Sequence, residues 1–133
     1  MVDQSLMDAY PAVSYLESRA RKRIPLFAWE YLASGTGRDE AMDRNIEAFS
    51  KVMFTPTFMK GEVEVELETE LFGTTYNTPF GISPVGLTGL MWPRAEHFLA
   101  ATAARYKMPY GLSTVATETP ETVGAVAGGM GWF

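Results

Sequence analysis

The sequence lacks cysteine and contains a single histidine, His97. Without cysteine the chain can form no disulfide, no thiolate metal site and no thiol nucleophile. Positive charge is also scarce, because 11 Lys and Arg residues stand against 16 Asp and Glu residues, and the net charge is −5. Binding to a nucleic-acid backbone depends on a surplus of positive charge, so a nucleic-acid partner is not expected. The one basic cluster, residues 19–23, is expected to be the solvated face of a helix.

Long hydrophobic segments are missing as well. The longest mostly apolar run, residues 79–92, is too short to cross a bilayer as a helix. The N-terminal segment MVDQSLMDAYP contains neither the basic part nor the apolar part of a signal peptide. The chain is nevertheless 47% hydrophobic over 133 residues, which is ordinary for a globular protein and sufficient for one domain with one core.

Three helices are expected between residues 12 and 50. The first covers residues 12–23, and the second runs from Pro25, since proline suits the first helical turn, to Ser34. Gly35 is expected to end the second helix at the C′ position, and Asp39 is expected to be the N-cap of the third. Apolar residues at helical spacing support the first and third helices: Val13, Leu16, Ala20, Met42, Ile46 and Phe49.

Residues 62–70 alternate strictly between glutamate and a strand-forming residue. This pattern predicts a half-buried strand with one solvated face. The five glutamates could suggest a cation site, but side chains two residues apart on a strand lie about 7 Å apart. Several of them cannot converge on one ion, so a metal site is not expected. Residues 72–77 predict a turn and a further short strand, which would complete a β-hairpin.

From Pro79 the pattern becomes strand, loop and helix in alternation. The strands are expected at residues 79–83, 108–112 and 130–133. The helices are expected to begin at Pro93 and at Thr119-Pro120. The apolar face of the first is expected to comprise Ala95, Phe98, Leu99, Thr102, Ala103 and Tyr106. Short loops in such an alternation predict parallel pairing by right-handed crossovers, and ligands of these folds bind at the carboxyl ends of the strands, here residues 83–86 and 113–115.

Pro84, Val85 and Gly86 lie at the first of these ends. A flat ring system could approach the backbone where a Cβ atom is missing, and free backbone groups could bond its edge. An ordinary turn would explain the same residues, and both interpretations stay open. The segment matches neither a dinucleotide fingerprint nor an ATP phosphate loop. At the second end, the Ser113 hydroxyl either contacts a ligand or bonds its own loop, and no serine-hydrolase turn surrounds it.

Tyr31 is either an aromatic core residue or a ligand whose hydroxyl binds a substrate carboxylate, a bond worth roughly 1.5–3 kcal/mol. His97 is expected at the surface, on the outer side of its helix. A general base in a parallel α/β fold belongs at a strand end that faces the substrate, so His97 is not expected to be one.

Eight segments, in order and spacing, resemble the N-terminal part of one enzyme family. They are Arg23-Ile24-Pro25, Trp29 to Gly35, Asp39-Glu40, Asn45 with Ala48-Phe49, Gly73, Pro79, Ile82 to Gly86 and Leu112 to Thr117. The family comprises the FMN-dependent α-hydroxy acid oxidases and dehydrogenases, such as glycolate oxidase, L-lactate dehydrogenase and mandelate dehydrogenase. The resemblance implies an incomplete TIM (β/α)8 barrel within one truncated domain over residues 1–133. Residues 1–78 would form helices and a β-hairpin, and residues 79–133 the first two βα units and the start of a third strand.

The resemblance also implies the site. FMN would be the cofactor, with Pro84, Val85 and Gly86 packing along the flavin and Ser113 beside it, and Tyr31 would bind the substrate carboxylate. Val115 stands where members often carry a bulkier residue near the substrate, and Trp92 replaces a histidine found in many members.

The implied reaction oxidises an L-2-hydroxy acid to the 2-oxo acid. The histidine base and the substrate arginines would follow Phe133, so no catalytic residue is expected in this chain, and the chain alone is expected to be inactive. Another FMN barrel enzyme or a non-catalytic interaction module are the alternatives. The resemblance leaves the electron acceptor open, implies a homo-oligomer, and is compatible with a cytoplasmic enzyme or one peripheral at the membrane.

Overall fold

The computed structural model describes residues 4–62 and 64–133. The chain divides between Thr55 and Pro56 into two compact units. The expected division into residues 1–78 and 79–133 stays a prediction about the organisation of the whole enzyme.

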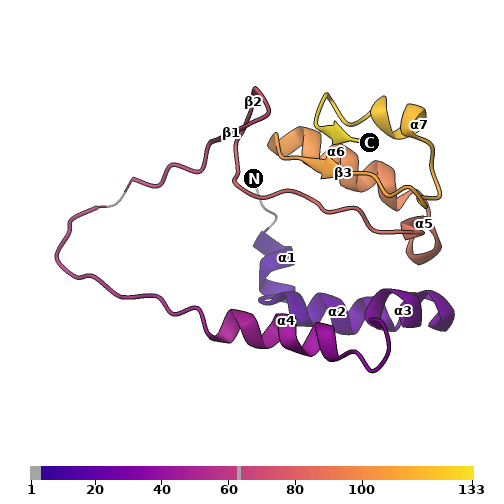
Figure 1. Ribbon diagram of the computed structural model, residues 1–133, viewed down its shortest axis with the longest axis horizontal. Helices are drawn as coiled ribbons and strands as arrows, with labels where there is room; N and C mark the ends of the chain where they lie inside the picture. The colour runs from indigo at the N-terminus through magenta and orange to yellow at the C-terminus, as the bar shows by residue number, and fades with distance from the viewer. Residues whose placement is uncertain (1–3, 63) are drawn as a thin grey trace. The chain divides into compact units, whose positions relative to one another are not determined.

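The first unit contains four helices within its described residues (Figure 1): α1 (Gln4–Ala9), α2 (Val13–Arg21), α3 (Leu26–Ala33) and α4 (Glu40–Ser50). The three predicted helices are therefore confirmed. Asp39 holds the N-cap position of α4, but its carboxylate does not cap the helix. It accepts a hydrogen bond from the Gly35 amide at 2.7 Å instead. The predicted apolar stripe of α4 is half wrong, since Met42 is half-buried while Ile46 and Phe49 are exposed.

The long strand predicted for residues 62–70 is wrong. Only its end forms β1 (Thr69–Leu71), which pairs antiparallel with β2 (Thr74–Tyr76). Val65 is 72% exposed, and Val63 lies outside the described residues. A strand needs a neighbouring strand to pair with, and β2 offers only three residues. Among the described residues, no further strand pairs with the residues that precede Thr69. The hairpin itself is confirmed, with positive φ at Phe72 and Gly73, as a two-residue type I′ turn requires.

The second unit carries the predicted parallel pairing. β3 (Tyr110–Gly111) pairs parallel with β4 (Gly131–Trp132), and Ile82 forms a parallel bridge to Tyr110 on the other side of β3. The strands are shorter than predicted, and residues 79–83 are reduced to this single bridge. Prolines at positions 79, 84 and 109 flank the pairing, and a proline has no amide to donate to the ladder.

Three helices accompany these strands within the described residues: α5 (Thr88–Met91), α6 (Ala95–Tyr106) and α7 (Pro120–Gly124). The core lies between α6, α7 and β3 (Figure 1) and consists of Ala100, Ala103, Tyr110, Val123 and Ala127. The predicted apolar face of α6 is partly wrong, since Phe98 is 60% exposed and Tyr106 is exposed as well. The buried positions are Glu96, Ala100 and Ala103, so the helix is rotated relative to the prediction.

The start signal of α7 is confirmed, because the Thr119 hydroxyl accepts a hydrogen bond from the Thr122 amide at 3.4 Å. The described residues form no closed barrel. Among them, every helix is too short or too polar to cross a membrane.

Candidate functional site

The carboxyl end of the first parallel segment is open. Pro84 and Val85 are exposed and Gly86 is half-buried. Within the described part of the chain, the backbone amides of Val85 and Gly86 donate no hydrogen bond. Unpaired amides at an accessible strand end can bond the polar edge of a ring. This segment therefore fits a flat heteroaromatic group.

Pro84 is held by a close approach to the neighbouring strand. A Cβ atom on Gly111 would lie 2.7 Å from Cδ of Pro84, so the pyrrolidine ring occupies the space where a side chain of β3 would stand. Glycine at position 111 is thus required for Pro84 to keep its place at the strand end.

Ser113 lies two residues after β3 and is half-buried. Its Oγ accepts a hydrogen bond from the Val115 amide at 3.2 Å, which confirms the interpretation that this hydroxyl bonds its own loop. A serine hydroxyl also carries one donor. That O–H remains available for a ligand, so the loop bond and a ligand contact are compatible.

The two strand ends are joined by their backbones. The Leu87 amide donates to the Val115 carbonyl at 3.0 Å, and Leu87 adopts a left-handed conformation with φ of 54°. The strand ends were predicted at residues 83–86 and 113–115. The structure adds Leu87, whose bond to Val115 joins residues 84–87 and 113–115 into one continuous edge.

A buried carboxylate beneath this edge was missed by the sequence prediction. Glu96, in the first turn of α6, is 1% exposed. Its Oε1 accepts hydrogen bonds from the Thr117 amide at 3.0 Å and the Thr117 hydroxyl at 2.7 Å. The available signal was its spacing from Ala100 and Ala103, which are four and seven positions further along the same buried face.

The charge of Glu96 is maintained by these bonds. Burial alone would raise the pKa of Glu96, but hydrogen bonds, chiefly those from Thr117, outweigh it together, so that the pKa lies below its ordinary value. Burial, together with the nearby Glu96 charge, raises the pKa of Tyr110. Glu96 is therefore an anion at neutral pH.

The surface position predicted for His97 is wrong. Its side chain is 17% exposed, and its Nδ1 lies 3.8 Å from Oε1 of Glu118. The cause is the segment before α7, which brings Glu118 against this side of α6. The side chain belongs to α6 rather than to a strand end.

Tyr31 belongs to α3 in the first unit, whereas the other candidate residues belong to the second. It is 51% exposed, so the interpretation as a core aromatic is wrong. The buried aromatic of this helix is Trp29.

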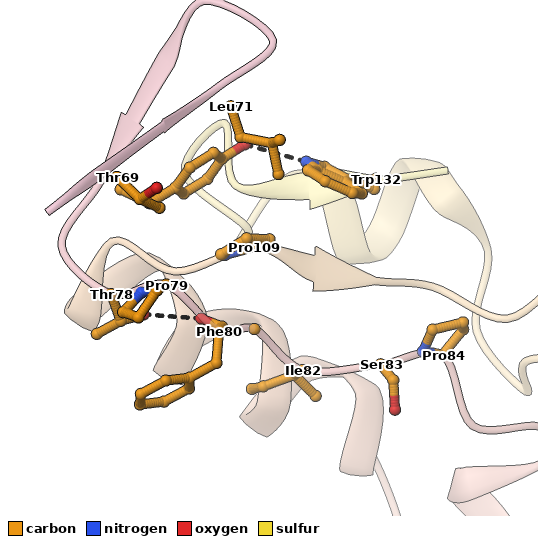
Figure 2. A pocket seen from close by; sticks show the side chains of 12 residues that line it. Thr69, Leu71, Thr78, Pro79, Phe80, Ile82, Ser83, Pro84, Pro109 and Trp132 are labelled. Carbon is orange, nitrogen blue, oxygen red and sulfur yellow. Dashed lines mark hydrogen bonds between the residues drawn. The ribbon is translucent and has the colours of Figure 1, made fainter. Parts of the chain in front are cut away.

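A hollow of about 310 Å³ lies beside the first strand end (Figure 2). It is enclosed by the β-hairpin, by residues 78–84 and by Trp132, whose Nε1 donates to the Tyr76 hydroxyl at 3.0 Å. Its walls are almost entirely apolar, so it suits apolar side chains better than a charged hydroxy acid. It shares Pro84 with the candidate site but not Val85, Gly86 or Ser113.

The family model described as FMN-dependent dehydrogenase matches residues 20–133. The chain belongs to this family. FMN is the cofactor of FMN-dependent dehydrogenases, and the resemblance noted in the sequence is confirmed.

Relatives and solved structures agree with this assignment. An L-lactate oxidase of Lysinibacillus sphaericus is 34% identical over 119 residues, or 89% of this chain and 31% of the relative. An L-lactate dehydrogenase of Xanthobacter autotrophicus is 34% identical over 86% of this chain and 29% of the relative. A mandelate oxidase variant with (S)-mandelic acid matches with a TM-score of 0.85 and 29% identity over 93% of this chain and 37% of that chain.

This FMN-dependent dehydrogenase chain thus spans about a third of the length of the curated relatives it matches. The structural neighbours are TIM-barrel flavoenzymes, and the match covers only part of each of them. The α/β class with parallel strands is confirmed.

Proposed function

We propose that this chain supplies the N-terminal part of a TIM-barrel enzyme that oxidises an L-2-hydroxy acid to the 2-oxo acid with FMN. The observation that carries the proposal is the open edge at residues 84–87 and 113–115, with unpaired amides at Val85 and Gly86, in a chain of the FMN-dependent dehydrogenase family. The incomplete barrel, with two βα units and the start of a third strand, is part of this proposal.

Each residue of the edge has a role in this proposal. The Val85 and Gly86 amides would hold the polar edge of the flavin, and Pro84 would pack along the ring. Ser113, whose hydroxyl keeps its donor, would hold the ring from the second loop. Bound FMN supplies the acceptor for the two electrons that leave the substrate. These side chains and amides hold and orient the ring, and none of them takes a proton.

The substrate class comes from the relatives. An L-lactate oxidase, L-lactate dehydrogenases and a mandelate oxidase are among them, so a small L-2-hydroxy acid is proposed. Tyr31 would bind its carboxylate through the hydroxyl. The proton-accepting base and the arginines would come from barrel segments outside these 133 residues, and the 133-residue chain by itself would be inactive.

The experiment is to express the complete reading frame that contains these residues and to measure its flavin. We expect a yellow protein with FMN at one equivalent, whose oxidised flavin absorbance bleaches without oxygen on addition of L-lactate, glycolate or (S)-mandelate. D-lactate is the stereochemical control and should leave the absorbance unchanged. A colourless protein that takes up no FMN would favour a non-catalytic interaction module. A flavoprotein that none of these acids reduces would favour another FMN barrel enzyme.

The same preparation tests two further parts of the proposal. We propose a homo-oligomer, to be measured by light scattering. We also propose that the enzyme is cytoplasmic or peripheral at the membrane. Fractionation should then find it in the soluble fraction, or in a membrane fraction from which salt releases it.

A further inference from the structure

We infer that Glu96 is a positioning residue that locks the two strand-end loops together and so presets the edge on which the cofactor rests. The inference rests on the proposed function, because it assigns a task to the edge at residues 84–87 and 113–115. The Glu96 clamp is defined as Glu96, Thr117, Gly89 and the backbone bond from Leu87 to Val115.

The first part of the clamp ties α6 to the second loop. Both hydrogen bonds from Thr117, one from its amide and one from its hydroxyl, end on the same oxygen of Glu96. Thr117 is 21 residues further along the chain. The carboxylate therefore fixes the position and the rotation of the backbone two residues after Val115.

The second part ties this loop to the first one. A Cβ atom on Gly89 would lie 2.0 Å from the Thr117 hydroxyl oxygen, so Thr117 packs directly on the backbone of α5. Two residues earlier in each loop, the Leu87 amide donates to the Val115 carbonyl. Thr117 is thus held between Glu96 and Gly89, and its position sets the geometry of the Leu87 bond.

A charged group suits this task better than a neutral one. Hydrogen bonds to an ionised acceptor are shorter and roughly twice as strong as bonds between neutral groups. Oε2 of Glu96 and the Thr88 hydroxyl are both buried without a hydrogen-bond partner among the described residues, so Thr117 supplies the hydrogen bonds that this carboxylate accepts there. A buried glutamate that only filled space would be costly, which favours a positioning role.

The Glu96 clamp affects the orientation of the unpaired amides of Val85 and Gly86. Val85 and Gly86 immediately precede Leu87, so a loop that is free to move about Leu87 would no longer present both amides in one orientation. Preorganised donors bind a ligand better than mobile ones because less ordering is needed on binding. Loss of the clamp should therefore weaken FMN binding and change the flavin environment, while the core of Ala100, Ala103 and Val123 remains packed.

The test compares four variants of the complete reading frame. Glu96→Gln removes the charge. Thr117→Val removes the hydroxyl and keeps the shape, whereas Thr117→Ser restores the hydroxyl. Thr102→Val is the matched control, because Thr102 lies on the same helix and its exposed hydroxyl bonds only the Phe98 carbonyl. FMN dissociation constants are measured by quenching of flavin fluorescence, with the visible circular dichroism of bound flavin and the hydrogen exchange of the Leu87 amide as further readouts.

We expect Glu96→Gln and Thr117→Val each to raise the FMN dissociation constant by about tenfold, the value of one good hydrogen bond. The Leu87 amide should exchange faster in both and the flavin dichroism should change, while Thr117→Ser and Thr102→Val stay close to wild type.

A clamp that is merely structural would lower the melting temperature with FMN affinity and dichroism unchanged, and that result overturns the inference. If Glu96→Gln does not fold, the comparison of Thr117→Val with Thr117→Ser tests the inference. A wild-type protein without FMN affinity overturns the proposed function and this inference together, whereas normal FMN binding by Thr117→Val overturns the inference alone.

Discussion

At the scale of single residues, the candidate site depends on small side chains and on one buried charge. Gly89 and Gly111 leave room for Thr117 and Pro84 respectively, and Glu96 keeps its charge because Thr117 supplies two donors. Tyr31, by contrast, is an exposed residue of α3, and its proposed role is to bind the substrate carboxylate.

Tyr31→Phe in the complete enzyme should weaken substrate binding without changing FMN content. The substitution removes one hydrogen bond to a carboxylate, and roughly 1.5–3 kcal/mol corresponds to a dissociation constant about ten- to a hundredfold higher. The measurement is the L-2-hydroxy acid concentration that half-reduces the flavin. Tyr15→Phe, an exposed tyrosine of α2, is the control, and unchanged kinetics in Tyr31→Phe would remove Tyr31 from the site.

The stability contributed by Glu96 should depend on pH. Its folded-state pKa lies below the ordinary value, so the charge contributes stability above the unfolded pKa, and that contribution is lost as the pH falls through the folded pKa. The difference in melting temperature between wild type and Glu96→Gln should therefore be largest near pH 7 and shrink below about pH 4, the ordinary glutamate range. A difference that is constant with pH would show that Glu96 does not carry the charge assigned to it.

Gly89→Ala should destabilise the protein by about 1–3 kcal/mol, as overpacking of a tight contact does. The added methyl group would collide with the Thr117 hydroxyl. The control is Gly124→Ala at the end of α7, where the new Cβ would lie 3.7 Å from its nearest neighbour. Urea unfolding of both variants measures the effect, and equal midpoints would contradict the close packing of Thr117 on α5.

The sequence allowed the neighbouring positions of the two strand ends to be predicted, but not the contacts that support them. Alternation of strands and helices places Pro84, Val85, Gly86 and Ser113 at neighbouring strand ends, because parallel strands share the direction of their carboxyl ends. The burial of Glu96 was not predicted, since glutamate side chains are ordinarily exposed to solvent. Its partner Thr117 lies 21 residues away, and only the packed structure brings the two together.

At the scale of elements, pairing partners decided where strands form. Residues 62–70 have an ideal alternation, but among those that the structure describes only Thr69 and Glu70 belong to a strand, β1, which lies opposite the three residues of β2. The β-hairpin turn could be predicted because Gly73 accepts positive φ locally. The docking of the hairpin near β4 could not, because it depends on a contact between Tyr76 and Trp132, which are 56 residues apart.

Tyr76→Phe should lower the free energy of unfolding by about 1 kcal/mol, because the Trp132 indole loses its hydrogen-bond acceptor. The contact between the β-hairpin and β4 should weaken as a result. The expected result is a lower melting temperature together with a change in tryptophan fluorescence. Tyr106→Phe is the control, since Tyr106 is exposed on α6. If both variants melt alike, the hydrogen bond contributes nothing to the position of the hairpin.

At the scale of the whole molecule, the described residues leave much apolar surface exposed. Phe49, Phe54 and Phe98 are exposed, and the hollow beside the hairpin has apolar walls. Exposed apolar area of this extent marks surfaces that are covered by something else. In the proposed enzyme the other strands and helices of the barrel would cover them, in keeping with relatives about three times as long as this chain.

The most direct test of the account is a crystal structure of the complete reading-frame product grown with FMN. The account predicts electron density for the flavin ring along Pro84, with the Val85 or Gly86 amide nitrogen about 3 Å from a polar atom of its rim and Ser113 beside it. A flavin bound elsewhere, or residues 84–86 covered by other side chains with no space for a ring, would contradict the central claim.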